Sequence, residues 1–214
     1  MRNASGIIAM LVLIPLAFLF ADAGPRFQFP EKSRSNARAR ASSVLIEKNK
    51  RRSFYGAHRA VDRKISTAWC TGKNNGVGES LRVRFEEVQA NAVYIFNGYG
   101  ASRRLYEANN RIKDVDITLL RCNGRKQTIR RRLPRNLCFG DTSRCGDLDK
   151  KCIKRAQRFC RLRDGESGLP EHEVQHIPPG CITGVVLRIR SVYPGRKYKD
   201  TCIAEVSPIR DGAL

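Results

Sequence analysis

Short runs in which apolar and polar residues alternate recur along this chain, and they constrain its fold more than any other feature. Residues 80–88 read SLRVRFEEV, residues 114–122 read DVDITLLRC, and residues 184–193 read GVVLRIRSVY. Such runs are typical of strands with one face against the core and one face in water. Because Gly, Asn and Pro clusters separate them, the pattern predicts an all-β, antiparallel β-sandwich.

The N-terminus has the pattern of a secretory signal. An apolar run from Ile7 to Phe20 follows Arg2 and ends at Ala21-Asp22-Ala23. The pattern predicts a signal peptide over residues 1–23, cleaved after Ala23. The alternative is an uncleaved membrane anchor, for which the run is short. We therefore expect a secreted, periplasmic or cell-surface protein without a membrane span after cleavage.

All eight cysteines follow that leader, and their number is even: Cys70, Cys122, Cys138, Cys145, Cys152, Cys160, Cys181 and Cys202. In an exported chain this predicts up to four disulfides. Paired C-x₂-C spacings, which a zinc ribbon needs, do not occur.

The charge is extreme, with 41 Lys and Arg against 20 Asp and Glu, for a net charge of +21. Such a field attracts nucleic acid, anionic glycans and anionic membrane surfaces alike. Residues 24–43 mix Pro, Ser, Ala and Arg without sustained periodicity, and we interpret them as a flexible basic leader. The sandwich is then expected over residues 44–210, with an inserted excursion at about residues 123–180.

The excursion contains one helical pattern. In residues 146–162, GDLDKKCIKRAQRFCRL, the apolar residues and cysteines recur at helical spacing. The opposite side of such a helix carries a basic stripe made of Lys151, Lys154, Arg155, Arg158 and Arg161. The stripe is either an anion-binding surface or a solvated helix face.

Three longer stretches carry a family resemblance: AVDRKISTAW at residues 60–69, FNGYGASRRLYEANNRIKDVDI at residues 96–117, and RIRSVYPGRKYKDTCIAEV at residues 188–206. Together they resemble discoidin-like, or galactose-binding-like, domains of the coagulation-factor C type. The version they resemble most is the translocation or glycan-binding sandwich of bacterial NAD glycohydrolase toxins. The resemblance covers residues 44–122 and 181–208. It implies a secreted bacterial protein with a jelly-roll-like sandwich whose loops at one end bind sugars.

The loop-like parts of these motifs hold the side chains that sugar binding needs, namely aromatic rings and planar hydrogen-bonding groups. We predict a glycan site from Asn97, Tyr99, Tyr106, Asn109, Asn110, Arg111, Tyr193, Lys197, Tyr198 and Asp200. Alternatively, Asn97-Gly98 and Pro194-Gly195 only form turns while the tyrosines pack the ends of the sandwich.

The family often holds a structural Ca²⁺ where a D-G-D-x-x-T-x-W loop meets a glutamate near the C-terminus. Asp62 and Glu205 match those positions, and Ser66 and Thr67 offer further oxygens. Lys64 stands where the second carboxylate of the loop belongs, and an ammonium opposes a calcium ion. We therefore hypothesise that the Lys64 amine replaces the ion and bridges Asp62 and Glu205, with no cofactor bound.

The resemblance also implies a disulfide pattern. It brings Cys70 close to Cys202 and Cys122 close to Cys181. Cys138, Cys145, Cys152 and Cys160 are then left to cross-link the excursion internally.

Residues 172–176 read HEVQH and match the H-E-x-x-H pattern of zinc proteases. Pro178 and Pro179 stop a helix within two turns, and the only other histidine is His58. The resemblance places a strand here, which would hold His172 and His176 about 13 Å apart, too far for one zinc ion. A zinc hydrolase acting through His172 and His176 is the minor alternative.

We therefore expect a non-catalytic, lectin-like protein that attaches to cell-surface or matrix glycans, with a basic surface that favours anionic glycans. The alternative is a cationic interaction protein that binds nucleic acid or anionic envelope polymers and uses the sandwich as a scaffold.

Overall fold

The computed structural model of the protein describes residues 36–135 and 174–210. Its strands are β1 (Arg38–Ala41), β2 (Trp69–Cys70), β3 (Ser80–Phe96), β4 (Arg111–Arg121), β5 (Lys126–Arg132), β6 (Val174–Tyr193), β7 (Cys202–Ile203) and β8 (Glu205–Arg210). Its helices are α1 (Arg103–Ala108) and two short 3₁₀ helices, η1 (Ala57–Val61) and η2 (Asn74–Gly76).

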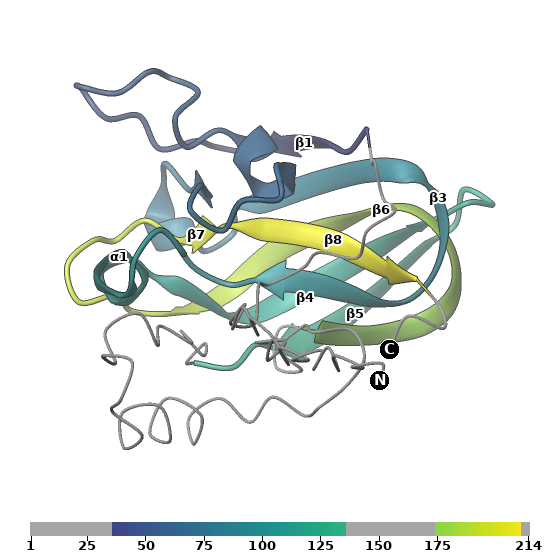
Figure 1. The fold of residues 1–214 in the computed structure, drawn as a ribbon. Coiled ribbons are helices and arrows are strands. Elements are labelled where there is room, and N and C mark those ends of the chain that lie inside the picture. The colour runs from purple at the N-terminus through teal and green to yellow at the C-terminus, as the bar shows by residue number, and fades with distance from the viewer. Residues whose placement is uncertain (1–35, 136–173, 211–214) are drawn as a thin grey trace, which may run out of the picture.

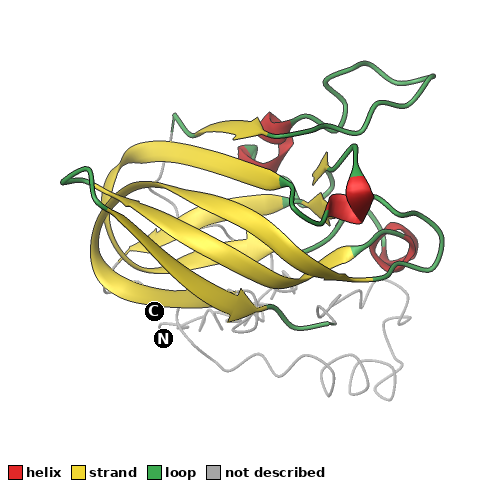
Figure 2. Ribbon diagram, turned by 180° about the vertical axis from the view of Figure 1, so that it is seen from behind, coloured by secondary structure: helices red, strands yellow, loops and turns green. Residues whose placement is uncertain are grey.

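One antiparallel sheet makes up most of the described structure. Its strand order is β1-β3-β6-β4-β5, and β8 pairs with the second half of β3. The long strands β3 and β6 bend round together at one end, so that each contributes to both layers (Figures 1 and 2). Their pairing shifts register between Arg84 and Val88 and again between Ala90 and Ala92, where β-bulges accommodate the bend. The prediction of an all-β antiparallel sandwich is confirmed.

The alternating sequence builds the main core between the layers. Leu81, Val83 and Phe85 of β3 are buried there, while Arg82 and Arg84 between them face solvent. β4 and β6 contribute the buried faces that their alternation predicted. The single tryptophan, Trp69, is fully buried in this core, and its indole N–H donates to the Ser43 carbonyl over 2.8 Å.

A second buried cluster lies on the other face of the β3–β8 layer. Ala92, Tyr94 and Phe96 of β3 pack there with Cys70 and Cys202. The second half of β3 is therefore buried on both faces, which explains its nearly continuous apolar sequence. The loops that carry the candidate site rest on this cluster.

The two disulfides in the described residues, Cys70–Cys202 and Cys122–Cys181, are the pairs that the family resemblance implied. Cys70 and Cys202 also face each other across the β2–β7 pair. Cys138, Cys145, Cys152 and Cys160, the expected helix and its basic stripe lie outside the described residues.

One local prediction was wrong. β1 lies inside the segment expected to be a flexible leader, because Ala39 and Ala41 pack on the core while Arg38 and Arg40 face outward. Two alanines give too weak an apolar signal to be recognised as a strand.

The Pro-Pro-Gly segment at residues 178–180 lies within β6. It occupies an irregularity in the β3–β6 pairing, where prolines need no ladder hydrogen bond. Within the described residues, no helix is long and apolar enough to span a membrane.

Candidate functional site

The candidate site lies at the end of the sandwich that carries α1 and β7 (Figure 1). The segment after β1, the β3–α1 connection and the β6–β7 loop come together there. Backbone hydrogen bonds fix this arrangement: the Leu45 N–H donates to the Cys70 carbonyl, and the Lys197 and Tyr198 N–H groups both donate to the Ala108 carbonyl at the end of α1.

The three predicted asparagines are buried and hold the loops together. The Asn97 side-chain amide donates to the Ile112 carbonyl and accepts from the Ile112 N–H, each over 2.8 Å. Asn109 donates to the Leu105 carbonyl at the end of α1 over 2.7 Å. Asn110 donates to the Lys199 carbonyl over 2.6 Å and accepts from the Gly195 N–H over 2.7 Å. With exposures of 2–4%, these side chains shape the loops and are not accessible to a ligand.

Arg111 and Tyr106 form a second buried support. The Arg111 guanidinium lies 4.6 Å from the centre of the Tyr106 ring and donates to the Tyr106 carbonyl over 2.6 Å. Gly98 also packs against this ring, and a Cβ atom there would come within 2.5 Å of a Tyr106 ring carbon. Gly98 has a φ of 140°, so the Asn-Gly pair is required for this packing. Arg111 and Tyr106 therefore position the β3–α1 connection.

Tyr193 also has a structural contact. It is half-buried, and its hydroxyl donates to the Leu133 carbonyl over 3.1 Å. Six of the ten predicted residues thus hydrogen-bond backbone groups of the protein: Asn97, Tyr106, Asn109, Asn110, Arg111 and Tyr193.

Two of the remaining predicted residues, Tyr99 and Asp200, lie near two residues that the sequence did not single out, Glu47 and Tyr55. We call Glu47, Tyr55, Tyr99 and Asp200 the tyrosine–carboxylate cluster. The Tyr55 ring meets the Tyr99 ring edge-on at 6.2 Å between centroids. Burial raises the pKa of Tyr55, and the charges of Glu47 and Asp200 raise it further. The cluster thus gathers two carboxylates and two tyrosine hydroxyls.

Solvent reaches this cluster unevenly. Glu47 is exposed, Tyr55 and Asp200 are half-buried, and Tyr99 is 9% exposed. Burial is the main cause that raises the pKa of both Tyr99 and Asp200, and Glu47 adds to it. A neutral, hydroxyl-bearing ligand suits these groups better than an anion, because the cluster itself carries carboxylates.

Aromatic side chains stand exposed on the loops of this end. Tyr198 is 40% exposed, and the Lys197 amine lies 5.1 Å from its ring centre. Phe54 is 37% exposed, with the Lys50 amine 4.7 Å from its ring and the Tyr55 ring packed edge-on at 4.8 Å. Exposed rings of this kind are surfaces on which a sugar ring can stack.

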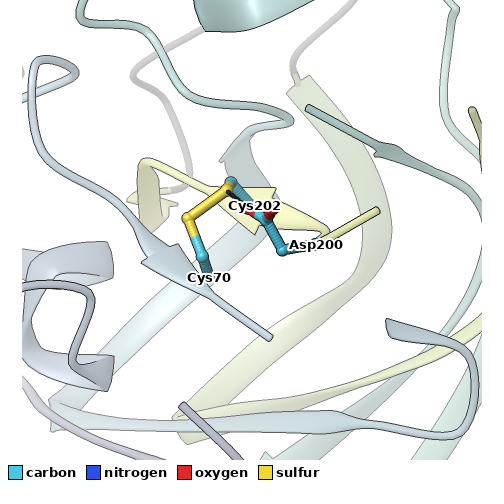
Figure 3. Close-up of side chains that lie close together, drawn as sticks. All are labelled: Cys70, Asp200 and Cys202. Carbon is cyan, nitrogen blue, oxygen red and sulfur yellow. Dashed lines mark hydrogen bonds between the residues drawn. A yellow bond between two sulfur atoms is a disulfide. The ribbon is translucent and has the colours of Figure 1, made fainter. Parts of the chain in front are cut away.

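Figure 3 shows Asp200 beside the Cys70–Cys202 disulfide, with its carboxylate oxygen 3.2 Å from the Cys202 sulfur. These three residues are close enough to suggest metal ligands. Both sulfurs are bonded to each other, however, so neither is a thiolate that could bind a metal. The disulfide instead anchors the loop that carries Asp200 and Tyr198.

The loop that the resemblance matches to a calcium site binds its carboxylates with protein hydrogen-bond donors. Asp62 accepts from the Lys64 N–H over 3.1 Å, from the Thr67 hydroxyl over 2.8 Å and from Arg59 over 3.3 Å. The 1%-exposed Glu205 accepts from the Arg63 N–H over 2.9 Å. Burial raises the pKa of Glu205 to about 8, with a further contribution from Asp62.

The hypothesis of a bridging Lys64 amine was wrong. Lys64 is exposed, and among the described residues its amine makes no ion pair with Asp62 or Glu205. Backbone N–H groups of residues 63 and 64 bind the two carboxylates, and Arg59 supplies the positive charge beside Asp62. Ca²⁺ needs six to eight oxygen ligands, and the backbone N–H donors at both carboxylates oppose it.

The zinc pattern is only partly described. His176 lies exposed in strand β6, as the resemblance implied, and not on a helix. His172 and Glu173 lie outside the described residues.

Residues 31–208 match the family model described as the NAD glycohydrolase translocation F5/8 type C domain. The chain belongs to this family. The F5/8 type C match includes β1, which agrees with the early start of the sandwich, and no curated protein matches the chain.

Several solved domains are similar to this F5/8 type C domain. One is the family 32 carbohydrate-binding module of C. perfringens NanJ in complex with galactose: 16% identity, 79% of this chain and 90% of that chain covered, TM-score 0.46. Another is the family 32 module of Streptococcus pneumoniae EndoD: 10% identity, 81% and 96% covered, TM-score 0.49. A third is the lectin domain of lectinolysin with Lewis B antigen: 14% identity, 86% and 99% covered, TM-score 0.46.

Proposed function

We propose that this domain is a non-catalytic carbohydrate-binding module that attaches an exported protein to glycans at a cell surface or in a matrix. The observation that carries the proposal is the tyrosine–carboxylate cluster beside the exposed rings of Tyr198 and Phe54. Carboxylates accept hydrogen bonds from sugar hydroxyls, and aromatic faces pack against sugar C–H surfaces.

Two further features support this proposal. The loops are held by buried asparagines, Arg111 and a disulfide, so the site is preorganised and loses little conformational entropy on binding. The disulfides also support an exported protein. Attachment to a surface glycan is compatible with the translocation role in the description of the family.

A glycan array at two salt concentrations tests the proposal. Wild type should bind neutral glycans at both salt concentrations, because the cluster offers hydrogen bonds and ring contacts that salt screens weakly. Tyr198→Ala should lose this binding at an unchanged melting temperature, since the side chain is 40% exposed. Tyr198→Phe, which keeps the ring, is the matched control and should retain most of it. If neutral glycans are not bound, or if both variants bind like wild type, the proposed site is wrong.

A further inference from the structure

The solvent face of the β1-β3-β6-β4-β5 sheet is strongly basic. It presents Arg38 and Arg40 of β1, Arg82 and Arg84 of β3, Arg188 and Arg190 of β6, and Lys126, Arg130 and Arg132 of β5. We call these residues the basic sheet face. A depression of about 530 Å³ lies in it, lined among others by Ser80, Arg82, Thr118, Lys126 and Arg188.

The β1–β3 edge places like charges directly opposite each other. Arg38 is the cross-strand partner of Arg84, and Arg40 is the partner of Arg82. Like charges in this position destabilise a sheet. None of these four arginines makes an ion pair with a described residue. The folded domain thus carries a repulsion that an anionic ligand would relieve.

The opposite edge of the same face is different. Asp116 accepts from Arg130 over 2.9 Å and from Arg190 over 2.6 Å, while Asp114 accepts from Arg132 over 2.8 Å. The two aspartates of the face, Asp114 and Asp116, are therefore paired with arginines, while Glu86 beyond Arg84 is hydrogen-bonded by Asn36 over 3.1 Å. The basic side chains of the face that make no ion pair with a described residue include Arg40, Arg82, Arg188 and Lys126, and these are available to a ligand.

The floor between these charges is made of short side chains, two threonines and Val186. Val186 lies between Arg82 and Thr118 in register, and the Thr118 and Thr128 hydroxyls hydrogen-bond over 2.9 Å. Five strands spaced ~4.8 Å apart make the face about 19 Å wide. That width suits an extended polymer with several charges better than a single small anion.

The chemistry of the face favours a polysaccharide over a nucleic acid. Arginine forks bind sulfate or carboxylate groups in two-point contacts. Single-stranded nucleic acid binding instead relies on aromatic rings for base stacking. Among the described residues, the exposed large apolar side chains are Ile46, Phe54, Val77 and Tyr198, and none of them belongs to a strand of this face.

We propose that the basic sheet face is a second binding site, specific for an anionic polysaccharide that carries sulfate or carboxylate groups. The site is separate from the loop-end cluster, and neither proposal depends on the other. Neutral sugars would bind at the loops, and the anionic chain would cross the strands.

The test compares Arg40→Gln/Arg82→Gln with Arg51→Gln/Arg52→Gln, which removes the same charge from an exposed loop. Binding of the full chain to heparin oligosaccharides is measured over a salt series. The sheet-face variant should bind at least about tenfold more weakly, with a salt slope smaller by about two, one for each contact removed. Its melting temperature should be equal or higher, because a like-charge pair is gone.

Three results would overturn the proposal. The control variant could weaken binding as much as the sheet-face variant, which would mean that only net charge matters. A variant of the basic stripe, Arg155→Gln/Arg158→Gln, could abolish heparin binding while the sheet-face variant leaves it intact. A short DNA duplex of equal charge could bind as tightly as heparin and depend equally on Arg40 and Arg82, which would reassign the face to nucleic acid.

Discussion

Replacing Glu205 with glutamine is expected to change how the stability of the domain depends on pH. The buried Glu205 carboxyl has a pKa of about 8 in the folded protein, against an ordinary value of 4.5. The folded state therefore holds this proton more tightly than the unfolded state does. Stability from this group is complete below about pH 4.5 and is lost as pH rises towards 8.

The magnitude follows from that interval. Each pH unit between the two values costs at most about 1.4 kcal/mol, so the full loss is roughly 5 kcal/mol as an upper limit. Glutamine cannot ionise, and its carbonyl can still accept the Arg63 N–H. Near pH 8 Glu205→Gln should therefore be more stable than wild type by a few kcal/mol, and near pH 5 the two proteins should be nearly equal.

Urea denaturation of both proteins from pH 5 to pH 9 measures this difference, because the contributions of all other titrating groups cancel between them. Parallel stability curves would refute the burial argument. A repeat with added CaCl₂ is the control, since a bound calcium ion would hold Glu205 ionised and remove the slope. We expect calcium to leave the curves unchanged, because the loop does not fit the ion.

Three further predictions concern the framework of the loops. Asn97→Ala should lower the unfolding free energy by about 2–3 kcal/mol, because it leaves buried backbone groups of Ile112 without their partner; a smaller loss in urea denaturation would contradict the clamp. Gly98→Ala should destabilise by at least about 2 kcal/mol, because the new Cβ meets the Tyr106 ring at 2.5 Å, and a melting temperature equal to wild type would count against that packing. Cys70→Ser/Cys202→Ser should lower the unfolding free energy by about 2–5 kcal/mol, and a reductant should then no longer lower the melting temperature through this bond. A variant as stable as wild type would show that the disulfide is dispensable.

Much of the fold could be predicted from the sequence because alternating apolar and polar residues mark the buried face of each strand. The alternation of Leu81, Val83 and Phe85 with arginines is sufficient to identify the inner face of β3. The long motifs also placed Cys70 with Cys202 and Cys122 with Cys181. β1 could not be recognised, because its inward residues are only alanines.

The candidate site was harder to predict because the same polar residue types bind ligands and support loops. Asn97, Asn110 and Arg111 lie in motifs that suggest a binding site, yet their side chains donate hydrogen bonds to backbone carbonyls. Glu47 and Tyr55 lie in no motif and reach Tyr99 and Asp200 through the tertiary fold. The basic sheet face was missed for a related reason: Arg40 and Arg82 are far apart in the sequence, and only the strand register makes them neighbours.

The central claim, carbohydrate binding at the loop end, is tested most directly by the dissociation constant for the best neutral glycan. It should be measured by calorimetry for wild type and for Glu47→Gln/Tyr198→Ala at physiological and at high salt. We predict that the wild-type constant changes by less than about twofold with salt, while the variant binds at least about tenfold more weakly at an unchanged melting temperature. Equal affinity of wild type and variant, or binding that disappears at high salt, would contradict the account.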